Sequence, residues 1–149
     1  MRFDSVAACG LVPVLCVILA LASARADGIV NVTLQDATDG QDVSGMKITA
    51  TPDSVKAGRV TIHANNQSKG LVHEVIVVVP KTTGGNLPYN GRTGQVIEEQ
   101  ITHLGEVSDL SPGKSASLTL RLEPGDYLLI CNQPNHYKAG MWTKLTVTQ

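Results

Sequence analysis

The sequence predicts an all-β fold, an antiparallel sandwich or barrel made of short strands. About seven apolar runs are separated by Gly, Pro or Asn along residues 29–149. These runs are rich in Val and Thr, whose β-branched side chains pack well on a pleated surface. Aromatic residues make up only 3% of the 149 residues, so the core must consist of Val, Leu and Ile. This length suits one globular domain.

The first four expected strands differ in their patterning. Residues 29–35 alternate apolar and polar side chains, which predicts a strand with one buried face. The runs 45–52 and 58–66 follow, and Gly and Asn residues bound them. Residues 72–80 are almost continuously apolar, which is typical of a strand buried on both faces.

The second half of the chain is expected to hold three more strands and one long loop. Residues 114–132 form two strands joined by a turn at 123–126, where Pro presets φ and Gly relaxes it. Residues 141–149 form the last strand. The stretch 81–103 contains seven Gly, Pro and Asn residues, which interrupt regular structure, and predicts a loop with a short helix over 95–101.

The first 26 residues are predicted to be a signal peptide. An apolar stretch over residues 6–21 follows a basic residue, and Ala24 and Ala26 form a small-residue cleavage pattern. The stretch is interrupted by Gly and Pro and is short for a membrane span, so cleavage is favoured over a retained anchor. We expect a mature domain of residues 27–149, periplasmic or secreted, with no stable membrane insertion.

Charge and cysteine counts narrow the possible functions. Removal of the leader leaves ten basic and twelve acidic residues, without a basic stripe, so nucleic-acid binding is not expected. It also leaves Cys131 as the only cysteine of the mature chain. Exported domains usually use cysteines in pairs. Cys131 is therefore an intermolecular bridge, an inert buried thiol or a metal ligand.

The segment "CNQPNHYKAGM" places a thiol, an imidazole and a thioether at intervals of five residues: Cys131, His136 and Met141. His73 stands at the start of the buried run 72–80. Two imidazoles, one thiolate and a weak thioether suit one copper ion that cycles between Cu(I) and Cu(II). Zinc is less suitable because structural zinc sites seldom use Met. A loop with Cys and Met as core filler is the simpler alternative.

The two other mature histidines are expected to have structural roles. His63 lies in the middle of the strand 58–66, and His103 lies in the long loop without a partner at ligand spacing. A lone histidine on a strand or loop is more often a hydrogen-bonded residue than a ligand.

The chain resembles the cupredoxin family of blue-copper proteins over residues 29–149. The resemblance rests on "LVHEVIVVV" around His73, on "DLSPGKSASLTLRLEPGDYLLIC" leading to Cys131, and on the segment 131–141, whose spacing is most similar to rusticyanin and sulfocyanin. It implies a Greek-key β-sandwich of seven to eight strands. It also implies His73, Cys131 and His136 as trigonal ligands and Met141 as the axial ligand.

The chain departs from the family's pattern at three positions. The residue before His73 is Val72, where azurin has a glycine whose carbonyl approaches the metal, so the resemblance implies no fifth ligand here. Many relatives have Asn after the first ligand His, where it ties the two ligand loops together; here the residue is Glu74. A Gly often precedes the second His, and here Asn135 takes its place. Asn tolerates left-handed backbone better than most residues, so the loop is expected to fold alike.

The resemblance implies an exported, monomeric single-electron carrier that meets larger redox proteins, a cytochrome or a copper enzyme, in brief encounters. The electron would leave through the edge of His136, ringed by an apolar surface that includes Pro134, Tyr137, Leu71 and Trp142. The alternative function is copper buffering or delivery in the periplasm. An enzyme is not expected, because four mature histidines cannot supply a trinuclear copper cluster and no catalytic triad stands out.

Overall fold

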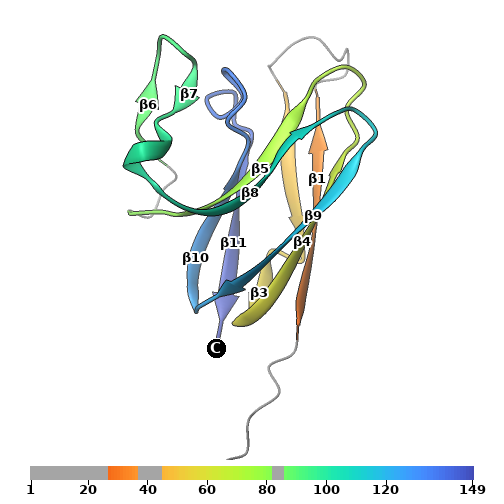
Figure 1. The fold of residues 1–149 in the computed structure, drawn as a ribbon, viewed down its shortest axis with the longest axis vertical. Helices are drawn as coiled ribbons and strands as arrows, with labels where there is room; N and C mark the ends of the chain where they lie inside the picture. Colours follow the sequence, from red (N-terminus) through yellow and green to blue (C-terminus); the bar gives the residue numbers. More distant parts are fainter. Residues whose placement is uncertain (1–26, 37–44, 82–85) are drawn as a thin grey trace, which may run out of the picture.

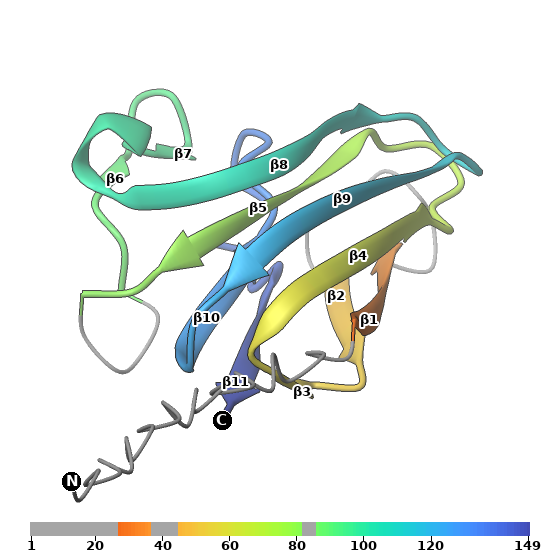
Figure 2. The same ribbon diagram turned by 60° about the horizontal axis from the view of Figure 1, so that its bottom comes forward.

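Two β-sheets packed face to face make up most of the described protein (Figures 1 and 2). The computed structural model describes residues 27–36, 45–81 and 86–149. The signal peptide predicted over residues 1–26 lies outside the described residues and stays a prediction. Within the described ranges, no helix is long and apolar enough to span a membrane.

The first sheet has the strand order β2-β1-β4-β9. Its strands are β1 (Gly28–Gln35), β2 (Lys47–Thr51), β4 (Gly58–Asn66) and β9 (Ser115–Leu122). Val30, Val32 and Leu34 of β1 are fully buried, and the intervening residues of the strand face outward, as their alternation predicts. β1 pairs in parallel with β4 and antiparallel with β2.

The second sheet has the order β3-β11-β10-β5-β8. Its strands are β3 (Ser54–Lys56), β11 (Trp142–Thr148), β10 (Gly125–Ile130), β5 (His73–Val79) and β8 (Thr102–Leu110). β3 and β11 run parallel, and the other pairs of this sheet are antiparallel. The chain passes repeatedly from one sheet to the other, as a Greek-key sandwich requires.

β5 is buried on both faces, which confirms the prediction from its apolar run. Val75 and Val77 point into the main core between the sheets, whereas Ile76 and Val78 belong to a second apolar cluster on the other face. β5 lies between β10 and β8 in its sheet, and its two faces are covered by the first sheet on the inner side and by a further chain segment on the outer side. The site of interest lies at the N-terminal end of this rigid strand.

The segment that packs over the outer side of β5 belongs to the stretch 81–103, for which the sequence predicts a long loop. It contains a small hairpin, β6 (Tyr89–Asn90) and β7 (Gln95–Val96), followed by the 3₁₀ helix η1 (Glu98–Gln100). The short helix near the end of the stretch is therefore confirmed in part. Figure 1 shows the hairpin standing beside the loop that joins β10 to β11. Its buried Val96 packs in the second cluster.

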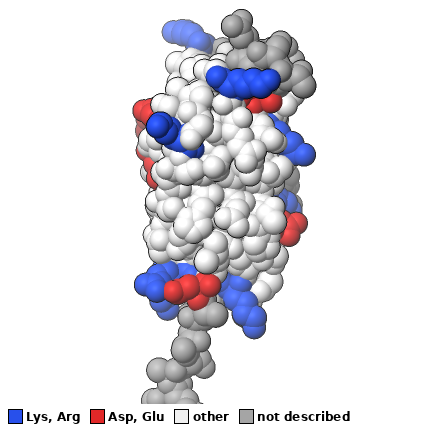
Figure 3. Space-filling model, turned by 90° about the vertical axis from the view of Figure 1, so that its right-hand side faces the viewer, with Lys and Arg blue, Asp and Glu red and all other residues white. Residues whose placement is uncertain are grey.

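The predicted fold class is confirmed, with eleven strands among the described residues in place of seven or eight. Four strands lie outside the seven expected runs. β3 has three residues and β6 and β7 have two each, which is too short to produce a recognisable alternation. The fourth, β8, has nine residues, but its burial pattern does not alternate regularly, and His103, expected in the long loop, lies in this strand. The outer face of the first sheet bears few charges at its centre (Figure 3). There Thr61 and His63 of β4 pair with Thr119 and Ser117 of β9.

Candidate metal centre

Strand pairing brings the two ends of the predicted ligand set together. β5 and β10 are antiparallel neighbours, with Ile130 opposite Ile76. The start of β5 therefore meets the end of β10, and His73 lies beside Cys131, which directly follows β10. The loop from residue 131 to 141 then returns to β11. Cys131 N–H donates to the carbonyl of Met141 at 3.1 Å and closes the base of this loop.

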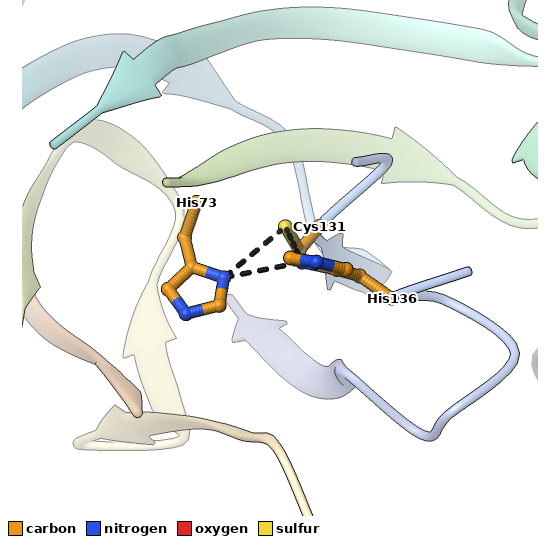
Figure 4. A group of neighbouring side chains, drawn as sticks. All are labelled: His73, Cys131 and His136. Carbon is orange, nitrogen blue, oxygen red and sulfur yellow. Dashed lines mark hydrogen bonds between the residues drawn. The ribbon is translucent and has the colours of Figure 1, made fainter. Parts of the chain in front are cut away.

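Three of the predicted ligand atoms converge on one point (Figure 4). The Nδ1 atoms of His73 and His136 lie 3.2 Å apart. Cys131 Sγ lies 3.8 Å from the first and 3.3 Å from the second. A point equidistant from all three atoms lies about 2.0 Å from each, which matches a metal–nitrogen bond of roughly 2.0–2.1 Å and is a little shorter than a metal–sulfur bond of roughly 2.3 Å. The three residues therefore fit a site that would hold a metal ion.

Burial keeps these three groups neutral in the metal-free protein. His73 and Cys131 have no exposed surface, and His136 is 6% exposed. Burial raises the pKa of the Cys131 thiol to about 12. Burial also lowers the pKa of His73, and burial together with the neighbouring His73 lowers the pKa of His136 to about 4. To hold a metal cation here, Cys131 would have to lose its thiol proton, whereas both imidazoles are already uncharged.

Met141 lies at the end of the same loop, fully buried in the main core with Cys131. Its N–H donates to the carbonyl of His136 at 3.0 Å. The backbone of Met141 is thus bonded to both Cys131 and His136, and the three residues form one closed loop. Thioether sulfur is a soft and weak donor that suits an axial position.

His73 is supported from behind by two residues that the sequence did not single out. Its Nε2 lies 2.7 Å from Ser68 Oγ and 3.6 Å from Asp36 Oδ1. Burial by itself would raise the pKa of Asp36, but hydrogen bonds from Ser68 and from the amides of Gly70 and Lys69 outweigh it and lower the pKa. The anionic carboxylate favours a proton on Nε2, which leaves Nδ1 free to bind a metal.

Glu74 ties the two ligand segments together, which answers the question raised by its replacement of Asn. Its backbone N–H points at Cys131 Sγ at 3.4 Å, and its side-chain Oε1 accepts the N–H of Asn132 at 2.9 Å. A carboxylate oxygen can thus make the tie expected of an amide. Burial, with the acidic neighbours Glu106 and Glu98, raises the pKa of Glu74 to about 7.

The turn of the ligand loop depends on Asn135, which has φ of 70°. The expectation that Asn takes a left-handed conformation here is therefore confirmed. The expectation of an apolar ring around His136 is wrong for Tyr137, which is 6% exposed and accepts a hydrogen bond from Leu87 N–H. Tyr137 and half-buried Trp142 belong to the second cluster. Pro134 is exposed and Leu71 is half-buried.

The two histidines expected to be structural lie away from the centre. His63 is exposed, and its Nδ1 lies 2.6 Å from Ser117 Oγ on the neighbouring strand. His103 is exposed on β8, but it is less isolated than its sequence position indicates. Ligand atoms of His103, Glu98 and Glu106 all lie within 4.8 Å of one another. Glu98 and Glu106 already accept hydrogen bonds, from Asn132 and Ser108.

Comparison with known proteins decides the family. The sequence profile described as "Sulfocyanin (SoxE) domain" matches residues 17–149. The chain belongs to the sulfocyanin family. This assignment confirms the predicted cupredoxin resemblance, including the likeness of the ligand-loop spacing to sulfocyanin. Cupredoxins bind one copper ion, and the His73–Cys131–His136 cluster with nearby Met141 fits such a centre.

Individual relatives are more distant. Auracyanin-B of Chloroflexus aurantiacus is 55% identical over 40 residues, which are 26% of this chain and 17% of that protein. The reduced auracyanin of Roseiflexus castenholzii is 19% identical, with a TM-score of 0.56 over 82% of this chain and 97% of the other. Rusticyanin of Thiobacillus ferrooxidans is 19% identical, with a TM-score of 0.53 over 80% and 77%. These structural likenesses show the fold.

Proposed function

We propose that this sulfocyanin-family protein holds one type 1 copper ion and acts as a single-electron carrier between larger redox proteins. His73, Cys131 and His136 would be the trigonal ligands and Met141 the axial one. The observation that supports this most is the near-equilateral triangle of two imidazole nitrogens and one sulfur, already at metal-binding separation in the folded chain. Such a donor set suits copper in both oxidation states.

The surroundings of the donors favour electron transfer over catalysis or delivery. Copper supplies the one-electron couple, and the protein supplies a site whose ligands move little. His73 is fixed by the central strand β5, and Cys131 by the end of β10. With all three donors buried, the site offers no open position for a substrate, and a delivered ion would have to leave through packed side chains. These features support a resident copper ion.

His136 is the donor nearest to solvent, and it lies in a loop whose neighbours Pro134 and Asn135 are exposed. An electron would pass most directly to a partner that touches this loop. The partner would be a cytochrome or a copper enzyme, in a transient complex with monomeric protein. Cleavage near Ala26 would place the carrier in the periplasm or outside the cell.

The test is spectroscopic. The full chain is expressed, its mature mass is measured to locate the cleavage site, and Cu(II) is added with recording of visible and EPR spectra. We expect an intense thiolate-to-copper absorption band and a compressed copper hyperfine splitting, because sulfur shares the unpaired electron.

Cys131→Ser is the matched variant, since it keeps the size of the side chain and removes the thiolate. We expect it to lose the intense band. A wild-type protein that binds Cu(II) only weakly and without colour, or a band that survives in Cys131→Ser, would overturn the proposal. Stopped-flow exchange with a cytochrome then tests the carrier role itself.

A further inference from the structure

The segment from Leu87 to Glu98 lies far from the ligands in sequence but is bonded to the ligand loop at several places. Asn135 N–H donates to the Gly94 carbonyl at 2.7 Å, and Leu87 N–H donates to Tyr137 Oη at 3.1 Å. Lys138 Nζ lies 5.0 Å from the centre of the Tyr89 ring. These contacts hold the far side of the loop, on either side of His136.

Asn132, the residue after Cys131, makes most of the remaining hydrogen bonds between this segment and the ligand loop. Its Oδ1 accepts from Val96 N–H at 2.6 Å, and its Nδ2 donates to the Val96 carbonyl at 3.1 Å and to Glu98 Oε1 at 2.8 Å. Its carbonyl accepts from Gln95 Nε2 at 3.1 Å. Asn132 is only 2% exposed, and its two bonds to the Val96 backbone are buried and shielded from water.

The two segments also approach each other too closely for a side chain on Gly94. Gly94 has φ of 73°, and a Cβ at this position would lie 2.6 Å from Asn135 Oδ1 and 3.0 Å from the Asn135 backbone nitrogen. Asn135 Oδ1 ends an exposed side chain and can rotate away, but the contact with the Asn135 backbone nitrogen is relieved only by a shift of the turn itself. Asn135 itself adopts a left-handed conformation. The positions of Gly94 and of the turn before His136 are therefore fixed together.

We infer that the segment Leu87–Glu98 is a brace that holds the ligand loop in its metal-binding shape before any metal arrives, with Asn132 and Gly94 as positioning residues. The loop bears both Cys131 and His136, so the brace sets their separation. In a free loop of eleven residues, His136 would sample many positions and each metal-binding event would have to order it. The consequence for function rests on the proposed copper site, but the brace itself does not.

The experiment compares Gly94→Ala with Gly113→Ala. The two glycines have nearly the same φ, 73° and 71°, so both substitutions introduce a similar backbone strain. A Cβ at Gly113 meets nothing within 4 Å, whereas a Cβ at Gly94 meets Asn135. The pair therefore separates the loss of close contact with the ligand loop from general destabilisation.

Amide hydrogen exchange is measured on the copper-free proteins. In Gly94→Ala we expect the amides of Asn135 and Val96 to exchange at least about tenfold faster than in wild type, because the brace opens locally. In Gly113→Ala they are expected to keep their wild-type rates relative to core strands such as β5. Unchanged exchange at Asn135 and Val96 in Gly94→Ala would overturn the inference.

Copper retention is the second readout, with Asn132→Ala as an independent variant. Both Gly94→Ala and Asn132→Ala are expected to lose Cu(II) to a competing chelator about tenfold faster than Gly113→Ala, with altered hyperfine splitting. Equal rates in all three variants would contradict a positioning role. If wild type forms no type 1 centre, the proposed function fails, and hydrogen exchange still decides whether the brace exists.

Discussion

The two sides of the metal centre are held by different means. On one side, His73 begins the central strand β5, and its far nitrogen faces Ser68 and the buried carboxylate of Asp36. On the other side, Cys131 and His136 lie in a loop that the brace covers from outside the main core. The first side is fixed by a strand and by charge, and the second by hydrogen bonds to a separate hairpin.

This difference indicates what each side contributes. A strand buried on both faces can move only if the sandwich opens, so His73 is a fixed reference point. A loop held mainly by hydrogen bonds to a two-strand hairpin can open while the core stays intact, since local opening costs less than global unfolding. The loop side therefore sets how readily copper enters and leaves, and the strand side sets the electrostatics at the metal.

The largest effect is expected from Asp36→Asn, which removes the negative charge behind His73. We expect copper affinity to fall about tenfold to hundredfold, as is common when the partner of a ligating histidine is lost. The reduction potential should rise, because a lost negative charge disfavours Cu(II) more than Cu(I). Competition titration and redox titration measure the two quantities.

Asp53→Asn is the control for Asp36→Asn, because it makes the same charge change at an exposed position. It should leave both quantities close to wild type. If the two sides are held independently, the backbone amide of Asn135 in Asp36→Asn should exchange its hydrogen at the wild-type rate. If Asp36→Asn both weakened copper binding and sped up amide exchange at Asn135, the two sides of the centre would not be held independently.

The second-largest effect is expected on the stability of the copper-free protein. It comes from Glu74, which joins both sides of the metal centre. Its folded pKa of about 7 exceeds its ordinary value of 4.5, so the folded state binds more protons between these values. The Glu74 contribution to stability is therefore lost as pH rises from 4.5 through 7. Glu74→Gln keeps the acceptor oxygen for Asn132 and removes the charge. We expect it to gain about 2 kcal/mol over wild type at pH 8, a value reduced for partial exposure.

Chemical denaturation of wild type and Glu74→Gln at pH 5 and pH 8 measures this gain. The difference between the two proteins isolates the contribution of Glu74, because all other titratable residues are the same in both. Glu123→Gln, an exposed position, is the control. If the difference in stability between wild type and Glu74→Gln were the same at both pH values, ionisation of Glu74 would not destabilise the protein.

The smallest effect is expected at the centre of the outer face of the first sheet, which bears few charges. His63→Ala removes one cross-strand hydrogen bond to Ser117 at an exposed position. We expect a loss of at most about 0.5 kcal/mol of stability and no change in the visible or EPR spectrum. A spectral change on this substitution would mean that the outer face of the first sheet influences the metal centre, in addition to the strand side and the loop side.

Several features of the protein could be derived from the residues alone. The alternation in 29–35 and the apolar run 72–80 predict which strands have one buried face and which have two, because side-chain direction repeats every two residues. The spacing of Cys131, His136 and Met141 indicates one loop with metal-binding chemistry. These signals are local, so they survive without knowledge of the fold.

What only the tertiary structure decided concerns residues far apart in the chain. Asp36 and Ser68 meet His73 because the parallel strands β1 and β4, which they follow, finish at the same end of the first sheet. The stretch around Gly94 gives no sign in sequence that it binds the loop 131–141, since its two-residue strands have no period. Tyr137 is buried because that hairpin covers it. Sequence patterns specify faces and turns, but sheet register and stacking decide which faces meet.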